Sequence, residues 1–144
     1  MAAIEQTLVL IKPDGVERGL VGEIIGRIER KGYAIRDLRM VQASRDVLEQ
    51  HYAEHEGKPF YEPLVEFMQS GPVVALRVEG QRVIEGFRSL AGATDPTSAA
   101  PGTIRGDLGR DWDAGVLLNV VHGSDAPESV SYTHLRAHET PEHL

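Results

Sequence analysis

The sequence predicts an α/β (α+β) fold of the ferredoxin-like type, with the order βαββαβ and helices on one face of a four-stranded antiparallel sheet. Apolar runs that suit strands alternate with segments whose apolar residues recur at helical spacing. Neither G-x-G-x-x-G nor G-x-x-x-x-G-K-[ST] follows the first predicted strand, which weakens the alternative of a doubly wound sheet.

The composition suits one globular domain, with 144 residues, 41% hydrophobic and 26% charged. The formal net charge of −7 argues against nonspecific binding of nucleic acid or an anionic membrane, but a few convergent cations could still bind a small anion. The lack of cysteine excludes a disulfide framework and a thiol nucleophile. The longest apolar run near the N-terminus, Leu8 to Ile11, is too short for a signal peptide or membrane span, so we expect a cytoplasmic protein.

The first third of the chain predicts a strand, a helix and a second strand. Thr7 to Ile11 is a continuous apolar run, which indicates a strand buried on both faces, and Lys12-Pro-Asp-Gly15 then predicts a turn. An amphipathic helix ended by Gly32 follows, with apolar residues at Val21, Ile24, Ile25 and Ile28. Tyr33 to Val41 predicts the second strand.

Two short helices are predicted before the third strand, Val73 to Val78. Asp46 and Glu49 have the spacing of a capping box for a helix through His55. Phe60 to Gln69 predicts the second of these helices, with an apolar face of Phe60, Leu64, Phe67 and Met68.

The last part of the domain predicts a helix, a long loop and a strand. Gln81 to Ala91 is amphipathic, and residues 92–107 have no periodicity. Irregular loops of this length in compact domains are usually functional or disordered, and the presence of Thr94 and Arg105 favours a functional one. Val116 to Val121 predicts the final strand.

His122 is the candidate nucleophile, because it follows this strand and precedes Gly123 and a helix-start pattern at Asp125 and Glu128. Imidazole is neutral and nucleophilic near pH 7, and a helix N-terminus favours a phosphate nearby. The alternative is a polar residue that merely ends a strand.

Three cations could bind that phosphate, at Lys12, Arg88 and Arg105. If they converge, three charge-assisted bonds contribute about 5–9 kcal/mol, compared with about 8 kcal/mol for micromolar binding before association costs. Thr94 and Asn119 add neutral donors, and Phe60 could stack on a base. The alternatives are a solvated Lys12 and a core position for Phe60.

His51 and His55 are four residues apart on one predicted helix face, a spacing that can bind a metal. The sequence offers no third ligand beside them, so we predict no metal site made by the protein.

Five segments resemble the motifs of the nucleoside diphosphate kinase family, in the family's order and within residues 5–129. They are Thr7–Asp14, His51–Phe60, Ser70–Pro72, Pro101–Asp107 and Asn119–Asp125. The resemblance implies a ferredoxin-like domain assembled into hexamers or tetramers. It also implies Mg²⁺-dependent, ping-pong transfer of the γ-phosphate between nucleoside tri- and diphosphates through a phosphohistidine.

On this resemblance, His122 is the phosphorylated nucleophile, Tyr52 lies beside it, and Phe60 stacks on the base. The residues that bind the phosphates, or lie near them and the sugar hydroxyls, match Lys12, Arg88, Thr94, Arg105 and Asn119. The family's Mg²⁺ is held chiefly by the nucleotide's phosphates and water, which implies no protein ligand. Contacts with phosphate, sugar and one generic stack predict broad base tolerance.

The sequence departs from the family in two places. Between Arg105 and Asn119 it is a few residues longer, which predicts a lengthened hairpin or strand edge at residues 109–113. Eleven residues after His122, where the family has a glutamate that orients the histidine, this chain has Thr133. We therefore predict a kinase-like domain over 1–129 and an atypical tail over 130–144. We interpret the tail as a non-native junction, with a divergent natural terminus as the alternative.

Three functions follow, of which an active nucleoside diphosphate kinase is favoured. The alternative is a nucleotide-binding or interaction protein of the same fold, whose catalysis is impaired because the tail lacks the residue that orients His122. A ferredoxin-like regulator that binds a small ligand ranks last, because it leaves the phosphate-binding residues unexplained.

Overall fold

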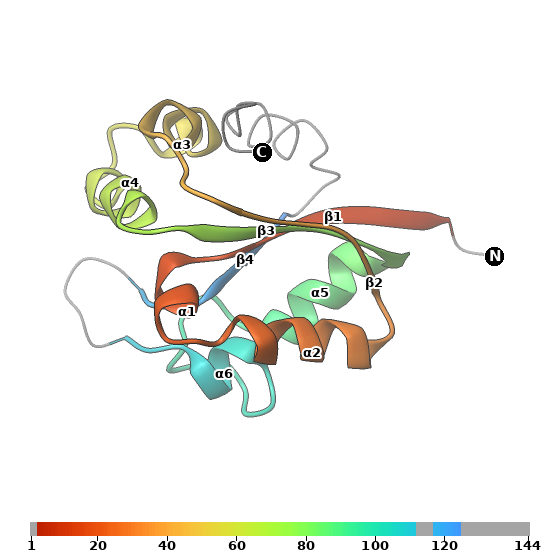
Figure 1. The fold of residues 1–144 in the computed structure, drawn as a ribbon. Coiled ribbons are helices and arrows are strands. Elements are labelled where there is room, and N and C mark those ends of the chain that lie inside the picture. The colour runs from red at the N-terminus through yellow and green to blue at the C-terminus, as the bar shows by residue number, and fades with distance from the viewer. Residues whose placement is uncertain (1–2, 112–116, 125–144) are drawn as a thin grey trace.

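The computed structural model describes residues 3–111 and 117–124, which form one antiparallel sheet with helices on both sides (Figure 1). The strand order is β2-β3-β1-β4, and the strands are β1 (Ile4–Ile11), β2 (Ala34–Val41), β3 (Val73–Gln81) and β4 (Val121–Gly123). The predicted ferredoxin-like arrangement is confirmed. Within these residues, no helix is both long and apolar enough to cross a membrane.

Strand β1 is the centre of the sheet. It pairs with β3 from Ile4–Gln81 to Ile11–Val74, and with β4 over three residues in which Leu10 faces His122. Every residue from Leu8 to Ile11 is at most 2% exposed, so the predicted burial on both faces is confirmed. The end of β1 therefore places Lys12 near the strand that carries His122.

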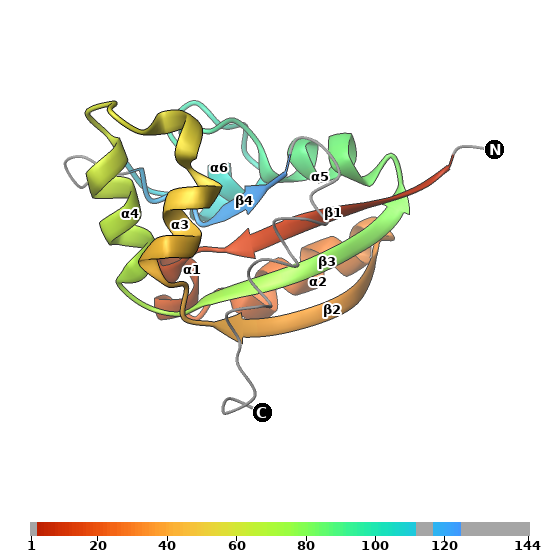
Figure 2. The same cartoon turned by 90° about the horizontal axis from the view of Figure 1, so that it is seen from above.

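Helices cover both faces of the sheet, whereas the sequence predicted one. Helices α2 (Val21–Lys31) and α5 (Val83–Ala91) lie on one face, and α3 (Arg45–His51) and α4 (Tyr61–Gln69) on the other (Figures 1 and 2). Alternate side chains of β1 belong to two separate cores, because Leu8 and Leu10 pack with α3 and α4 while Val9 and Ile11 pack with α2 and α5. A central strand without polar alternation requires such a second layer.

The helix ends were predicted with mixed success. Gly32 ends α2 in the left-handed region, at φ 104°, as predicted. The capping box at Asp46 is wrong, because Ser44 is the N-cap of α3 and its hydroxyl accepts the N–H of Val47. The helix also ends at His51, and a 3₁₀ turn, η1 (Ala53–His55), follows it.

Two further helices lie where none was predicted. Helix α1 (Pro13–Glu17) occupies the predicted turn, with proline at the first helical position, where its missing N–H has no cost. Helix α6 (Ile104–Leu108) ends the predicted irregular loop, and Thr103 caps it by accepting the N–H of Gly106.

The final strand is displaced from its predicted position. Val116 lies outside the described residues, Leu118 makes an isolated bridge with Arg110, and β4 begins at Val121. Asp125, Glu128, the tail over 130–144 and the last two residues of the predicted insertion at 109–113 also lie outside the described residues.

Candidate active site

A cavity of about 760 Å³ opens between α3, α5, the loop after α5 and the end of β4. Seven of the eight predicted site residues line it, namely Lys12, Tyr52, Arg88, Thr94, Arg105, Asn119 and His122. The structure therefore brings together residues from six separate parts of the chain around one space.

A tight turn precedes His122 and sets the direction of β4. Val120 has φ 75°, a value that is rare for a β-branched residue, and the N–H of Val121 donates to the carbonyl of Asn119 at 2.8 Å. This is the rare γ-turn with positive φ, whose backbone strain costs about 1–3 kcal/mol. The N–H of Lys12 donates to the Val120 carbonyl at 2.7 Å, which ties the turn to the end of β1.

The His122 imidazole is half-buried and lies among positive groups. Burial has the largest effect and, together with the nearby charges of His51, Lys12, Arg105 and Arg88 in that order, lowers the pKa of His122 to about 3. The ring is therefore neutral at pH 7, as a nucleophile must be. Its ring centroid is 5.2 Å from that of His51, in an edge-on contact. Within residues 3–111 and 117–124, no hydrogen bond orients the ring.

Asn119 connects Lys12 to the loop after α5. The buried Lys12 Nζ donates to Asn119 Oδ1 at 2.8 Å, and Asn119 Nδ2 donates to the carbonyl of Thr94 at 2.9 Å. Burial, followed by the charge of Arg105, lowers the pKa of Lys12 to about 8, while Asp14 opposes that shift. The amide of Asn119 thus positions the lysine and the loop.

Arg105 is fixed by two backbone carbonyls. Its Nη1 donates to Gly92 at 2.9 Å and its Nη2 donates to Val121 at 2.7 Å, directly before His122. The buried Nε–H has no hydrogen-bond partner among the described residues. Burial and the charge of Arg88 lower the pKa of Arg105.

The pKa shifts of this site indicate what ligand it suits. The pKa values of His122, Lys12 and Arg105 are all lowered by burial and by one another's positive charge or that of neighbouring cations. A negatively charged ligand would offset both the repulsion between these positive groups and the cost of burying them. The cavity therefore favours an anion, although the whole chain carries a net charge of −7.

Tyr52 and Phe60 differ in their relation to the cavity. Tyr52 is buried, its hydroxyl has no partner among the described residues, and burial raises its pKa to about 12. Phe60 does not line the cavity, but its ring centroid is 5.2 Å from that of His55, which does. Its 43% exposure rules out the alternative of a core side chain and leaves the ring accessible beside the cavity.

His51 was not predicted as a site residue. Sequence reasoning treated it with His55 as a possible metal pair, and the described residues contain no group of three histidine or carboxylate side chains that could bind a metal. Instead, His51 lines the cavity and contacts both Tyr52 and His122. Its position next to Tyr52 in the His51–Phe60 motif could have indicated this role.

Comparison with known proteins identifies the family to which this cavity belongs. A family model described as nucleoside diphosphate kinase matches residues 5–134. The chain belongs to the nucleoside diphosphate kinase family. The match ends five residues beyond the resemblance found in the sequence.

Relatives within this family are similar over most of their length. The nucleoside diphosphate kinase of Streptomyces avermitilis is 65% identical over 126 residues, which cover 87% of this chain and 89% of the relative. A halophilic nucleoside diphosphate kinase from Halobacterium salinarum, solved in complex with CDP, has a TM-score of 0.82 and 42% identity, covering 96% of this chain and 89% of that one. The Aquifex aeolicus nucleoside diphosphate kinase has a TM-score of 0.80 and 41% identity, covering 90% and 92%.

These similarities confirm the predicted activity. The chain is a nucleoside diphosphate kinase, a nucleotide-binding phosphotransferase that acts between nucleoside triphosphates and diphosphates. The alternative of a binding protein with impaired catalysis is not favoured at this level of identity.

Proposed function

We propose that His122 carries the phosphoryl group in a ping-pong exchange. The observation that supports this assignment is a neutral imidazole within a cavity whose cations have lowered pKa values. Such a ring can attack phosphorus at neutral pH, while the surrounding cations offset the charge of the transferring group.

The first half-reaction exchanges one bond for another. The unprotonated nitrogen of His122 attacks the γ-phosphorus in line, and the bond from phosphorus to the β–γ bridging oxygen breaks. The nucleoside diphosphate leaves with that electron pair. In the second half-reaction, a terminal oxygen of another diphosphate attacks the phosphohistidine and the N–P bond breaks, which regenerates neutral His122.

The remaining residues bind the nucleotide. Lys12 and Arg105 supply charge from the cavity floor, and Arg88 and Thr94 approach from its more exposed side. Phe60 stacks on the base beyond His55, Tyr52 packs beside the nucleophile, and Asn119 holds Lys12 in place. Because the base makes only this one nonspecific stacking contact, the enzyme should accept nucleotides with different bases.

Mg²⁺ fits this cavity as an ion that enters with the nucleotide. Mg²⁺ uses few protein carboxylates in phosphate-transfer sites, and the two that line the cavity, Glu54 and Glu85, can approach it through water. When bound, the ion neutralises charge on the phosphate oxygens. The protein's own residues position the phosphates and the imidazole.

We also propose that the protein assembles into hexamers or tetramers and that it is cytoplasmic. The edge strand β2 supports assembly, because its Leu38 and Met40 are 53% and 62% exposed. Sedimentation at micromolar concentration should show an oligomer, and a monomer would contradict the assembly.

The division into a domain over 1–129 and an atypical tail over 130–144 is likewise a proposal. Sequencing the source gene through the codons after Ser129 tests it, because an intact reading frame would contradict a non-native junction.

The function is tested by a labelling and chase experiment. Incubation with γ-labelled ATP and Mg²⁺ should give an acid-labile phosphohistidine that GDP removes as labelled GTP. The label should vanish in His122→Ala and persist in His138→Ala, a matched control in the tail. A label that survives in His122→Ala would refute the assignment of the nucleophile.

A further inference from the structure

Helix α6 carries Arg105 but is too short to be stable by itself. It has five residues, fewer than an isolated helix needs in water. Gly106 packs so closely on the preceding turn that an added Cβ would lie 2.1 Å from the carbonyl oxygen of Ala100. The position of Arg105 therefore depends on what holds this turn and helix against the rest of the domain.

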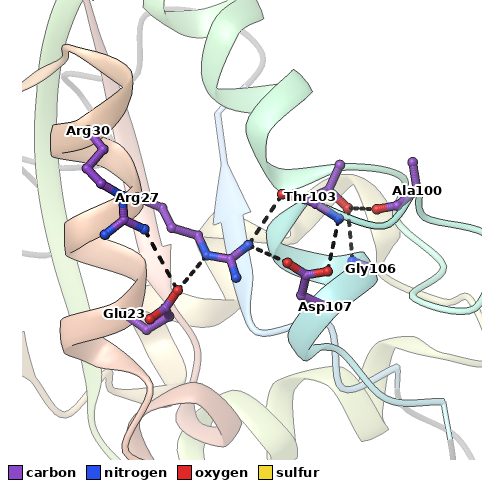
Figure 3. Close-up of polar contacts among 8 residues, drawn as sticks. Glu23, Arg27, Arg30, Ala100, Thr103, Gly106 and Asp107 are labelled. Carbon is purple, nitrogen blue, oxygen red and sulfur yellow. Dashed lines mark hydrogen bonds and ion pairs between the residues drawn. The ribbon is translucent and has the colours of Figure 1, made fainter.

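Arg27 holds the outer side of α6 from helix α2 (Figure 3). Its Nη1 lies 2.9 Å from Asp107 Oδ2, and its Nε donates to Glu23 Oε2 at 2.8 Å. The Arg27 side chain is 16% exposed and that of Asp107 is 33% exposed, so solvent reaches the pair mainly from the side of the carboxylate. One guanidinium thus contacts two carboxylates at once, which a lysine cannot do with the same geometry.

Asp107 connects Arg27 to the turn before α6. Its Oδ1 accepts the N–H of Gly102 at 2.9 Å, while Oδ2 faces Arg27. Arg27 Nη1 also donates to the Gly102 carbonyl at 3.4 Å. The Gly102 N–H and then Arg27 lower the pKa of Asp107, so the carboxylate is charged at neutral pH. The turn and the helix are therefore fastened together and to α2.

Arg105 and Asp107 project from different sides of α6. Residues two apart in a helix point about 200° apart around its axis. Arg105 reaches inward to the carbonyls of Gly92 and Val121, and Asp107 reaches outward to Arg27. A shift of this five-residue helix would move both side chains together.

We propose that the ion pair between Arg27 and Asp107 is a positioning element that fixes α6, and with it the Arg105 guanidinium, in the nucleotide cavity. The inference rests on the proposed function through the role of Arg105 as a phosphate ligand. Arg18 Nη1 also donates to the Leu108 carbonyl, at 2.6 Å, so removal of the pair should loosen α6 without releasing it.

The first test separates KM from kcat. Arg27→Gln and Asp107→Asn should each raise KM for ADP about five-fold with kcat within about two-fold, because Arg105 contacts the phosphates in both ground and transition states. Asp107→Glu should restore most of the affinity, and Arg27→Lys less of it. An unchanged KM in Asp107→Asn would overturn the proposal.

A matched control addresses general destabilisation. Glu79 forms a 2.9 Å ion pair with Arg36 on the sheet, away from the residues that line the cavity. Glu79→Gln should lower Tm by a similar amount and leave KM for ADP unchanged. If it raises KM as much as Asp107→Asn does, the effect is one of stability and the proposal fails.

A double-mutant cycle tests whether the effect passes through Arg105. In an Arg105→Gln background, Asp107→Asn should change KM less than about 1.5-fold, because the group that it positions is absent. A full five-fold effect in that background would overturn the inference. If the chain without substitutions forms no phosphohistidine, the proposed function fails instead. Failure of the proposed function is therefore distinguishable from failure of this inference.

Discussion

Raising the pH should deprotonate Lys12 within the range of an ordinary assay. Burial, followed by the charge of Arg105, lowers its pKa from 10.5 to about 8. If the charge is required for phosphate binding, about one tenth of the free enzyme stays competent at pH 9, and kcat/KM for ATP falls about tenfold below its plateau. A lysine with an ordinary pKa would lose less than about 5% of its charge at that pH.

Removal of the Asp14 charge should lower the pH at which kcat/KM begins to fall. The buried Asp14 carboxylate raises the pKa of Lys12. Asp14→Asn keeps the shape of the side chain and removes its charge, so the decline in kcat/KM should occur about one pH unit lower. As a control, Glu66→Gln removes an exposed charge from α4 and should leave the pH of that decline unchanged.

The pH dependence of stability should have the opposite sign. The folded pKa of Lys12 lies below the unfolded value of 10.5, so the unfolded chain binds more protons between about pH 8 and 10.5. Lys12 alone then adds up to about 3 kcal/mol of stability as the pH rises through that window. Activity that falls while Tm does not would identify deprotonation as the cause.

The measurement is kcat/KM for ATP from pH 6 to 9.5 with GDP as the acceptor, with Tm recorded at each pH. If kcat/KM shows no fall up to pH 9.5, or if the fall occurs at higher pH in Asp14→Asn, the reasoning is refuted.

Two other substitutions test the surroundings of His122. Gly123→Ala places a Cβ 2.6 Å from a ring carbon of the buried Phe87, so it should cost about 1–3 kcal/mol in urea unfolding and lower kcat by displacing His122. A loss below about 0.5 kcal/mol would contradict that packing argument. Thr133→Glu supplies the carboxylate that the family resemblance implies at this position and should raise kcat about tenfold or more in a coupled assay, with Thr133→Gln as the uncharged control. Equal kcat values for the two variants would show that the carboxylate is not limiting.

Much of the fold was predictable because hydrophobic pattern determines burial. The continuous apolar run Leu8 to Ile11 specified a strand buried on both faces, and the periodic residues before Gly32 specified α2. Local choices between similar signals were less predictable. Ser44 and Asp46 are both good capping residues, and what distinguishes them is the extended backbone of Ser44, at φ −79° and ψ 158°.

The errors around the site have a tertiary cause. An apolar run ending at Val121 predicts a strand, but the positive φ of Val120 is set by contacts with Lys12 and β1 that no local pattern contains. Helix α6 has too few residues for periodicity to reveal it, although Thr103 was a usable capping signal. The family motifs identified the residues that line the cavity, yet the contact of His51 with His122 required three-dimensional placement.

The short strand that carries His122 has a consequence for genetic screens. Its backbone is held in part by the Arg105 guanidinium at Val121, so the side chain that we propose as a phosphate ligand also stabilises the fold. A substitution at Arg105 would lower both the amount of folded protein in a cell and the turnover of each molecule. Growth-based scores at this position will therefore overstate its chemical contribution unless protein abundance is measured for every variant.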